Sequence, residues 1–376
     1  MMYDGTSVAV VVPAYNEEAH VGSVLESVPD WVDRIYAVDD CSTDGTWGEI
    51  RRVARTLNDR DPGISIPVAE RRDSRRPLRA GAGADDGAVS NGMESEVSNG
   101  MERLVRDGGL ERRVVPIRHE RNQGVGGAMK TGYRRARADG FDVAASMDGD
   151  GQMDPAFLPD LIDPIVRGEA RYTKGDRLRR QDSQREMSHW RLFGNTVLTA
   201  LTRVSSGYWG LTDSQNGYTA ISLDVFEEVD LEALYDDYGF LNDLLVHLNV
   251  HGVRIADVPM PARYGDESSG IRYRRFVPRL SWLLLWNFLW RLWTQYVVQG
   301  PRPVGGLFAL GGAAAITGGG LFMALVVGLA GVRSGTAFAL FAIGVVLVLV
   351  GLAVDVARND GQVLKLEDPD VGVADP

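Results

Sequence analysis

The stretch SVAVVVPAYNEE, residues 7–18, carries the first evidence about the fold. Its first half is a continuous run of small and β-branched apolar residues that ends at Pro13, which is typical of a strand buried on both faces of a parallel sheet. Its second half turns polar at once, and Asn16 begins a predicted helix with apolar residues along one face. A buried strand followed directly by an amphipathic helix predicts an α/β fold.

The same alternation of strand and helix continues along the chain to residue 258. Further predicted strands cover Arg34–Val38, Val114–Arg118, Val143–Met147, Gly217–Ser222 and Val253–Val258. The predicted helices between them cover Trp47–Leu57, Gly126–Asp139, Asp154–Arg167, Arg191–Thr202 and Phe240–His251. This order predicts a Rossmann-like, mostly parallel sheet that is flanked by helices and joined by right-handed crossovers.

One polar segment interrupts the alternation. Residues 70–113 are rich in Gly, Ala, Ser, Asp and Arg, and they contain the sequence VSNGME twice, at 89–94 and 97–102. Two polar copies are too few to build a solenoid. We expect a disordered surface insertion in a loop, and a regulatory or partner-binding loop is the alternative.

Composition narrows the class of protein. The chain of 376 residues has a formal net charge of −11, and only three of its 40 basic residues are Lys. Such a chain fits the high-salt cytoplasm of a halophilic archaeon, with a GC-rich genome as the alternative cause. The acidity argues against a nucleic-acid partner, because no basic stripe offsets it. Cys41 is the only cysteine, which excludes an internal disulfide and a cysteine-based metal site.

The two ends of the chain differ in character. The apolar run Val8–Val12 is too short for a signal peptide. Residues 276–298 place four tryptophans at helical spacing, namely Trp282, Trp286, Trp290 and Trp293. Beside a membrane segment this pattern predicts an amphipathic helix at the interface, and a soluble core is the alternative. The apolar runs Val304–Val332 and Thr336–Val354 then predict a transmembrane hairpin, with a buried helical pair as the alternative.

More basic residues lie beside the two ends of the predicted hairpin than in its turn. The turn holds Arg333, and the flanks hold Arg275, Arg279, Arg291, Arg302 and Arg358. The positive-inside rule therefore predicts a cell-membrane protein with two spans, whose α/β domain lies in the cytoplasm. The predicted division is an α/β domain at 1–270, an interfacial helix at 271–300, a hairpin at 301–358 and an acidic tail at 359–376.

Three polar clusters follow predicted strands, at the edge of an open α/β sheet where ligands bind. They are Pro13–Glu17, Asp39–Thr46 and Asp148–Gln152. Asp148 and Asp150, separated by one glycine, can turn towards a single Mg²⁺ or Mn²⁺ ion that bridges to a diphosphate. In isolation such a sequence is a surface turn, but here it follows a buried strand, and two other acidic strand ends precede it.

These clusters resemble the family 2 glycosyltransferases, which have the GT-A fold. VVVPAYNEE (10–18) and VDDCSTDGT (38–46) match the opening motifs of the family, and DGD (148–150) matches its metal-binding Asp-x-Asp. RNQGVGGA (121–128), GDR (175–177) and DSQNGY (213–218) resemble the polyprenyl-phosphate hexosyltransferase branch, which includes the dolichol-phosphate mannose synthases and glucosyltransferases.

The resemblance implies roles for individual residues. The base and ribose of a nucleotide sugar would be held by Pro13, Tyr15, Glu17 and Asp40. The metal and diphosphate would be bound by Asp148 and Asp150, with Gln152 beside them. The phosphates of donor or lipid would face Arg177 and Arg263, and Arg191 is a further candidate for the lipid phosphate. Each arginine has a surface ion pair as its alternative, and the predicted catalytic residues are Asp148, Asp150 and Arg177.

The resemblance also implies a reaction. A hexose, with UDP-glucose as the favoured donor, would pass to polyprenyl or dolichyl phosphate at the cytoplasmic membrane face. The reaction would be metal-dependent and inverting, and it would supply lipid-linked sugar for protein glycosylation. GDP-mannose and UDP-N-acetylglucosamine are alternative donors. A lipid phosphate needs no general base, whereas a hydroxyl acceptor would need one, for which Asp213 and Asp243 are candidates.

Two other functions compete with this one. A polysaccharide synthase of the same family would carry Gln-x-x-Arg-Trp, which is absent from this sequence, and more spans around a channel. A non-catalytic membrane scaffold that binds nucleotide sugars would have lost one of the acidic clusters, whereas Asp40, Asp148 and Asp150 are all present.

Overall fold

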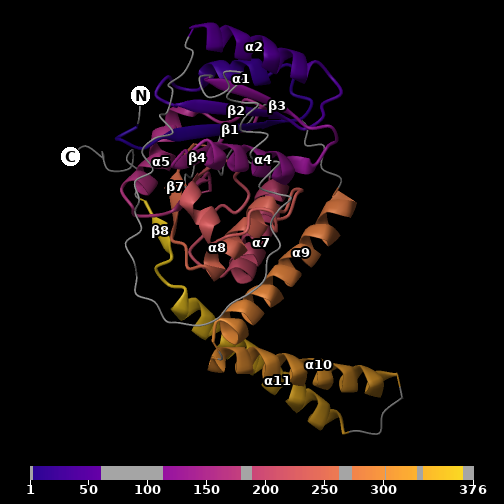
Figure 1. Ribbon diagram of the computed structural model, residues 1–376. Coiled ribbons are helices and arrows are strands. Elements are labelled where there is room, and N and C mark those ends of the chain that lie inside the picture. Colours follow the sequence, from indigo (N-terminus) through magenta and orange to yellow (C-terminus); the bar gives the residue numbers. More distant parts are fainter. Residues whose placement is uncertain are drawn as a thin grey trace, which may run out of the picture.

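The computed structural model describes residues 3–60, 113–178, 189–261, 273–300, 302–327 and 333–366. The predicted insertion at 70–113 lies outside these residues except for Arg113, and Arg263 also lies outside them. Within the described part, an α/β domain carries a pair of long helices that extends away from it (Figure 1).

Eight strands of the described chain form one sheet in the order β3-β2-β1-β4-β6-β5-β7-β8. The bounds are β1 Val8–Ala14, β2 Arg34–Asp39, β3 Val114–Arg118, β4 Val143–Ser146, β5 Tyr172–Asp176, β6 Thr219–Ser222, β7 Ile255–Pro259 and β8 Val363–Lys365. Neighbouring strands run parallel, except that β6 is antiparallel to both β4 and β5. The prediction of a mostly parallel sheet is confirmed.

Two strands were not predicted. β5 contains Thr, Lys, Gly and Asp among its five residues, so it shows no apolar run, although all five residues are buried. β8 lies in the segment 359–376 that we predicted to be an acidic tail, and it pairs in parallel with β7. Val363–Lys365 of that segment therefore form an edge strand of the sheet and not part of a tail.

Two layers of helices cover the sheet, because successive side chains of a strand point to opposite faces. Val8, Val10 and Val12 of β1 pack with α1 (Val21–Ser27), α2 (Thr46–Arg60) and α5 (Leu158–Val166). The intervening residues of β1 pack on the other face with α4 (Gly124–Ala138) and α8 (Phe240–Val250). The short 3₁₀ helices η2 (Pro155–Phe157) and η3 (Leu223–Glu227) complete the domain.

Most helices lie within a few residues of their predicted bounds, but α1 begins later. Asn16, the predicted first residue of that helix, has a φ of +58°, in the left-handed region that a right-handed helix excludes. The helix starts at Val21 instead, and residues 15–20 form a loop above the end of β1.

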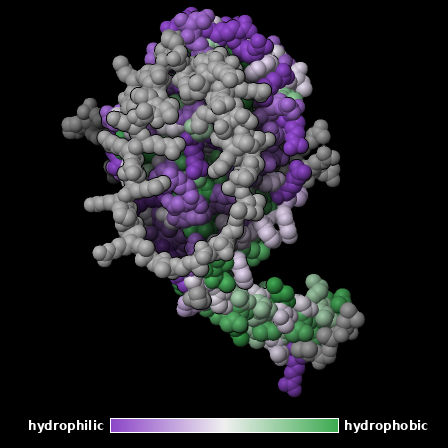
Figure 2. All heavy atoms as spheres, viewed as in Figure 1, coloured by the Kyte–Doolittle hydropathy of each residue, from purple (hydrophilic) through white to green (hydrophobic). Residues whose placement is uncertain are grey.

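The C-terminal part begins with α9 (Tyr273–Trp293), which packs on α7 (His189–Ser206) and α8 and ends in one turn of π-helix, η4 (Thr294–Val298). The hairpin helices α10 (Pro303–Val326) and α11 (Ser334–Arg358) are long and apolar enough to cross a membrane. Only 11% of the most apolar part of α10 and 17% of that of α11 are buried, so neither is a core helix of the domain. Figure 2 shows the hairpin as the apolar part of the surface on this side of the molecule.

Helix α9 turns three of its four tryptophans outward. Trp282, Trp286 and Trp293 are 67%, 59% and 61% exposed, whereas Trp290 stacks on His247 of α8 with 4.4 Å between ring centroids. The inward face carries buried leucines together with the polar residue Asn287, and Arg291 is fully buried. Arg291 is one of the basic residues that flank the hairpin in the sequence, and its burial distinguishes it from Arg302 and Arg358, which are exposed.

Candidate active site

The loops after β1 and β2 are joined by hydrogen bonds between their polar residues. The amide of Thr43 donates to the Asn16 side-chain oxygen at 2.9 Å, and the amide of Glu17 donates to the Thr46 hydroxyl at 2.7 Å. The amide of Gly45 donates to a carboxylate oxygen of Glu18 at 3.0 Å. The first two sequence clusters therefore form one continuous rim at the carboxyl edge of the sheet.

The third cluster is fixed to this rim through Pro13. The carbonyl of Pro13 accepts a hydrogen bond from the amide of Gly149 at 3.1 Å, which sets the loop between Asp148 and Asp150 beside the end of β1. Gly217 lies close to this loop, because a Cβ there would lie 3.0 Å from a carboxylate oxygen of Asp148, which is a tight contact. The loop before β6 therefore approaches the Asp148 carboxylate closely.

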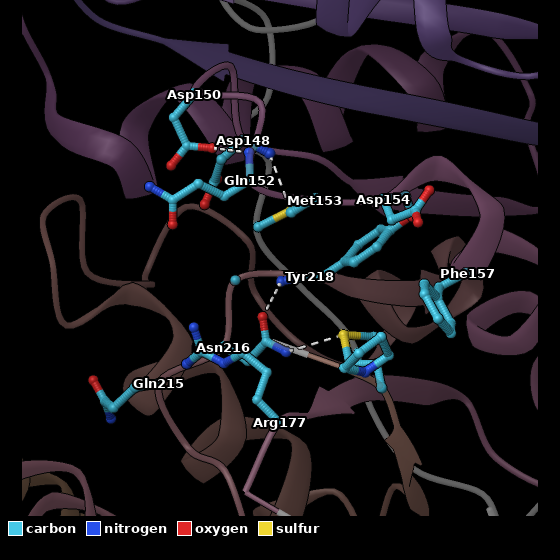
Figure 3. Close-up of a pocket in the computed structure, with 13 residues that line it drawn as sticks. Asp148, Asp150, Gln152, Met153, Asp154, Phe157, Arg177, Gln215, Asn216 and Tyr218 are labelled. Carbon is cyan, nitrogen blue, oxygen red and sulfur yellow. Dashed lines mark hydrogen bonds between the residues drawn. The ribbon is translucent and has the colours of Figure 1, made fainter. Parts of the chain in front are cut away.

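A pocket of about 110 Å³ opens below these loops (Figure 3). Four of the predicted site residues line it together, namely Asp148, Asp150, Gln152 and Arg177. The sequence did not predict the rest of its wall, which consists of Met153, Asp154, Phe157, Gln215, Asn216, Gly217, Tyr218, Met260 and Pro261. The motif DSQNGY, which pointed to this branch of the family, supplies four of these positions.

The carboxylates of the pocket repel one another. Burial, followed by the negative charge of Asp150, raises the pKa of Asp148 to about 7, although Arg177 acts in the opposite direction. Glu17 on the neighbouring loop adds to the repulsion. A divalent cation would relieve this repulsion and would find the hard oxygen ligands that Mg²⁺ and Mn²⁺ prefer.

Among the described residues, no group of three or more His, Cys, Asp or Glu side chains is arranged to hold a metal. Asp148 and Asp150 therefore fit an ion that takes its remaining ligands from a bound diphosphate and from water, which is how Mg²⁺ is commonly held at phosphate-binding sites. They do not form a complete cage of protein ligands.

Arg177 is held in position by Asp213, which is buried. The Arg177 Nε donates to one oxygen of Asp213 at 2.9 Å and Nη2 donates to the other at 3.3 Å. Although burial works in the opposite direction, the charge of Arg177 lowers the pKa of Asp213 below its ordinary value. Asp213 is thus an ionised partner of Arg177, and the sequence, which offered it as a general base, did not predict this pairing.

Lys174 on β5 is a second cation near the pocket, and it is fully buried. Its ammonium donates to the main-chain carbonyl of Asn216, in the loop that lines the pocket. Burial lowers the pKa of Lys174 to about 8, and the nearby Asp213 counteracts this effect. Nothing in the sequence pointed to this residue except that it is one of only three lysines.

The residues predicted to hold the nucleotide lie along the rim and not in the pocket. Tyr15 is 47% exposed and Pro13 is buried. Asp40 is buried, and its oxygens accept hydrogen bonds from the amides of Gln123 and Gly124, both at 2.8 Å, and lie 2.7 Å from the His119 ring. In this structure Asp40 orients the loop before α4, which the RNQGVGGA motif forms.

The remaining candidates are separate from the pocket or outside the described residues. Arg191 lies in the first turn of α7, and its side chain is outside the described part, as is Arg263. Asp243 is buried on α8, where it accepts hydrogen bonds from Asn287 of α9 and from the amide of Tyr235, both at 2.8 Å. Asp243 joins helices and is not one of the residues that line the pocket.

Comparison with known proteins identifies the family to which this site belongs. The model of Glycosyl transferase family 2 matches residues 9–74 and 85–230. The chain is 27% identical over 260 residues to UDP-N-acetylglucosamine--dolichyl-phosphate N-acetylglucosaminyltransferase of Methanococcus voltae, covering 69% of this chain and 86% of that relative. It is 24% identical over 264 residues to undecaprenyl-phosphate mannosyltransferase of Micrococcus luteus, covering 67% and 82%.

Solved structures with a similar chain trace include mannosyl-3-phosphoglycerate synthase from Rubrobacter xylanophilus. It has a TM-score of 0.46 and 18% identity, over 79% of this chain and 77% of that chain. Glucosyl-3-phosphoglycerate synthase from Mycobacterium tuberculosis has a TM-score of 0.45 and 19% identity, over 76% and 80%.

The family match covers more than half of the chain, and it includes all three loops that meet at the rim. The chain therefore belongs to glycosyl transferase family 2. It is a glycosyltransferase, with the α/β fold of that family and two apolar helices at its C-terminal side, which confirms the resemblance first noted from the motifs.

Proposed function

We propose that the chain transfers a sugar from a nucleotide sugar to a polyprenyl phosphate at the cytoplasmic face of a membrane, with inversion and with a divalent metal. The observation that carries the proposal is the pocket in which two repelling carboxylates, Asp148 and Asp150, face the guanidinium of Arg177. Acidic ligands for a metal and an adjacent cation are what a departing diphosphate requires.

On the donor side, each residue has a separate task. Asp148 and Asp150 would hold Mg²⁺ or Mn²⁺ against the diphosphate, and the ion would neutralise the charge that develops as the sugar departs. Arg177, fixed by Asp213, would bind a phosphate of the donor or of the acceptor. The rim that contains Tyr15 and Glu17 would cover the base and ribose.

The acceptor is proposed from the chemistry and from the relatives. Both curated relatives are named as enzymes that act on a lipid phosphate, and they differ in the sugar. A phosphate is already ionised near neutral pH, so it needs no general base. This fits a site in which Asp213 is bound to Arg177 and Asp243 is bound between helices, so that neither lines the pocket as a general base would.

The membrane placement is supported by the hairpin and by the helix that leads to it. α10 and α11 have the length and composition of membrane spans, and the outward tryptophans of α9 fit the interface beside them. Arg302 and Arg358 flank the hairpin, whereas its turn carries Arg333, which favours a cytoplasmic α/β domain. A lipid-linked sugar formed there would serve protein glycosylation.

For the donor we propose first the nucleotide and then the sugar. The DSQNGY motif favours UDP-glucose, and the relative from Methanococcus voltae uses, by its name, UDP-N-acetylglucosamine. Both are UDP sugars, so we expect a uridine diphosphate donor and place GDP-mannose second.

The test is transfer to lipid by the purified full chain in liposomes that contain polyprenyl phosphate. Each radiolabelled nucleotide sugar is supplied with Mg²⁺ or Mn²⁺, and the lipid is extracted into organic solvent. We expect mild-acid-labile label in the lipid with one UDP sugar, and loss of that label with a chelator. Label that appears only in water-soluble products would overturn the acceptor, and label that persists with chelator would overturn the role of the metal.

A further inference from the structure

A buried ion pair joins the apolar hairpin to the α/β domain. Asp355 lies in the last turn of α11, and Arg291 lies in α9, and both side chains are 0% exposed. Their two hydrogen bonds are bidentate, at 2.9 Å from Nη1 to Oδ1 and at 3.0 Å from Nη2 to Oδ2. A charge in such a place is tolerated only when it is fully paired, so each partner requires the other.

The surroundings satisfy all five N–H groups of the Arg291 guanidinium. Besides the bonds to Asp355, Nε donates to the carbonyl of Ser205 at 3.0 Å and Nη2 donates to that of Val204 at 3.1 Å. The fifth N–H, on Nη1, donates to the side-chain oxygen of Gln295 at 3.2 Å. Two of these acceptors are carbonyls of the last turn of α7, where a cation is favoured by the helix dipole.

Asp355 is equally saturated. Its oxygens also accept hydrogen bonds from the Tyr296 hydroxyl, from the Trp209 indole at 3.0 Å and from Asn359 at 3.3 Å. Gly207 leaves the room for this arrangement, because a Cβ at that position would lie 2.6 Å from Nη1 of Arg291. The pair therefore ties together the end of α7, the end of α9, η4 and the end of α11.

From the pair, direct contacts lead to the pocket. α7, whose last turn receives Arg291, places the Thr199 hydroxyl 3.2 Å from that of Ser214. Ser214 is the neighbour of Asp213, which holds Arg177 in the pocket. A second connection runs from Asn249 of α8 to Asn359 at 3.0 Å and to Gln362 at 2.7 Å, just before β8 joins the sheet. The hairpin is therefore attached to the domain through polar contacts of defined geometry.

We propose that Arg291 and Asp355 are positioning residues for the lipid acceptor. Their pair fixes the hairpin against α7, so that the pocket is held at one height and one orientation over the phosphate of a lipid in the bilayer. This inference rests on the proposed function, because it concerns an acceptor whose phosphate lies at the membrane surface. Neither residue lines the pocket, so the pair would act on the reaction through the placement of the domain and not by contact with the substrate.

The experiment compares two acceptors in the same full-length protein, reconstituted in liposomes. One is a long polyprenyl phosphate embedded in the bilayer, and the other is a water-soluble isoprenyl phosphate of about two isoprene units, which reaches the pocket wherever the domain lies. Asp355→Asn removes the charge at nearly constant size, and Asp360→Asn makes the same change at an exposed acid of the same segment. Arg291→Lys, which keeps the charge and loses the planar fork, is the second, milder variant.

For Asp355→Asn we expect kcat/KM for the embedded acceptor to fall about tenfold or more, since small misplacements of reacting groups have effects of this size. The value for the soluble acceptor should stay within about twofold, and Asp360→Asn should change neither. Arg291→Lys should also lower kcat/KM for the embedded acceptor relative to the soluble one, by a smaller factor. Equal losses for both acceptors, or no loss for either, would overturn the positioning role and leave the proposed function standing.

Amide hydrogen exchange of the same proteins provides a readout that does not depend on activity. Exchange should accelerate in β8 and at the end of α11 in Asp355→Asn, while β1 to β4 keep their protection. Unchanged exchange at these elements would also overturn the inference. If the unmodified protein used neither isoprenyl phosphate, the proposed function would fail, and hydrogen exchange alone would still decide whether the pair fixes the hairpin.

Discussion

Asp148 shows how the chemistry of the site conflicts with the stability of the fold. Its carboxylate is surrounded by Asp150, Glu17 and a close glycine, and its pKa is raised to about 7 by burial and by these charges. A residue in this position weakens the metal-free protein at neutral pH, because the fold must hold a charge that the unfolded chain exposes to water. Such a cost to stability is expected where a residue serves to bind a ligand and not to stabilise the fold.

Asp148→Asn should therefore change activity and stability in opposite directions. We expect transfer to fall about a hundredfold or more, because a charged ligand of the diphosphate-bound ion is lost. The melting temperature of the metal-free protein at pH 8 should stay equal or rise by a few degrees, because the repulsion with Asp150 is removed. Activity assays and thermal unfolding of the same preparation test both parts. Asp160→Asn, at an exposed acid of α5, is the control, and a large loss of stability in Asp148→Asn would contradict the argument.

Asp257 on β7 gives a prediction for pH. The hydroxyl of Thr212 lies against Asp257 at 2.7 Å and also against Asp176, and one hydroxyl proton cannot serve two ionised carboxylates. One of the two acids must contribute a proton, and burial, partly offset by Thr212, raises the pKa of Asp257 to about 7. An acid whose pKa is raised in the folded state is neutral in both states below pH 4 and ionised in both above pH 7, and stability falls between these values.

Asp257→Asn removes this titration. The melting temperature of the variant minus that of the unmodified protein should be smallest near pH 4.5, should rise as the pH increases to about 7, and should then level off. Thermal unfolding in detergent at several pH values measures the difference, in which the titration of other groups cancels. A difference that stays constant between pH 5 and pH 8 would show that Asp257 does not take up the proton.

The sequence predicted the role of a residue well where that role follows from a motif, and poorly where it follows from packing. Asp148, Asp150, Gln152 and Arg177 do meet in one pocket. The partner of Arg177 was not predictable, because Asp213 lies 36 residues away and reaches it only through the pairing of β5 with β6. Asp40 likewise carries a nucleotide-binding motif, but its hydrogen bonds to the loop before α4 can be seen only in three dimensions.

At the scale of elements, α9 departs from the usual arrangement of an amphipathic helix, because both of its faces mix apolar and polar side chains. Its tryptophans face outward, while Asn287 and Arg291 bind polar partners inside the protein. Helical spacing alone predicted that the helix exists, but spacing does not say which face is turned to the domain. The same limit explains β5, whose polar sequence hid a fully buried strand, whereas the apolar runs of β1 to β4 were predicted within about two residues, the usual uncertainty of element ends.

The four tryptophans of α9 should separate into two classes. Trp282→Ser combined with Trp286→Ser should leave the melting temperature nearly unchanged, because both rings are exposed, and should reduce quenching of the protein fluorescence by lipids with brominated acyl chains. Trp290→Ser should destabilise the fold by about 2 kcal/mol, because its ring stacks on His247. Equal quenching in the double variant and in the unmodified protein would mean that this face of α9 does not contact lipid.

At the scale of the whole molecule, β8 determines the topology that the chain allows. β8 follows α11 and pairs with β7, which precedes α9, so both ends of the hairpin must lie on the side of the α/β domain. Any membrane entered through α10 must be left through α11 on the same side. The sequence predicted this arrangement only from the distribution of arginines, and the strand pairing provides an independent reason for it.

Tags placed before residue 1 and after residue 376 should consequently behave alike. In sealed vesicles with the cytoplasmic face outward, added protease should remove both tags, and in vesicles of the opposite orientation it should remove neither until detergent is added. A tag within the turn that contains Arg333 should show the reverse pattern and serves as the internal control. Opposite behaviour of the two terminal tags would contradict the pairing of β8 with β7.

The position of β8 also has a consequence for biosynthesis. It is the last strand of the sheet to leave the ribosome, after both helices of the hairpin. Until then the edge of β7 is exposed, and an unpaired strand edge invites pairing with other chains. The nascent enzyme therefore cannot complete its sheet before α10 and α11 have been made, and a chain that stops short of β8 would leave the edge of β7 open.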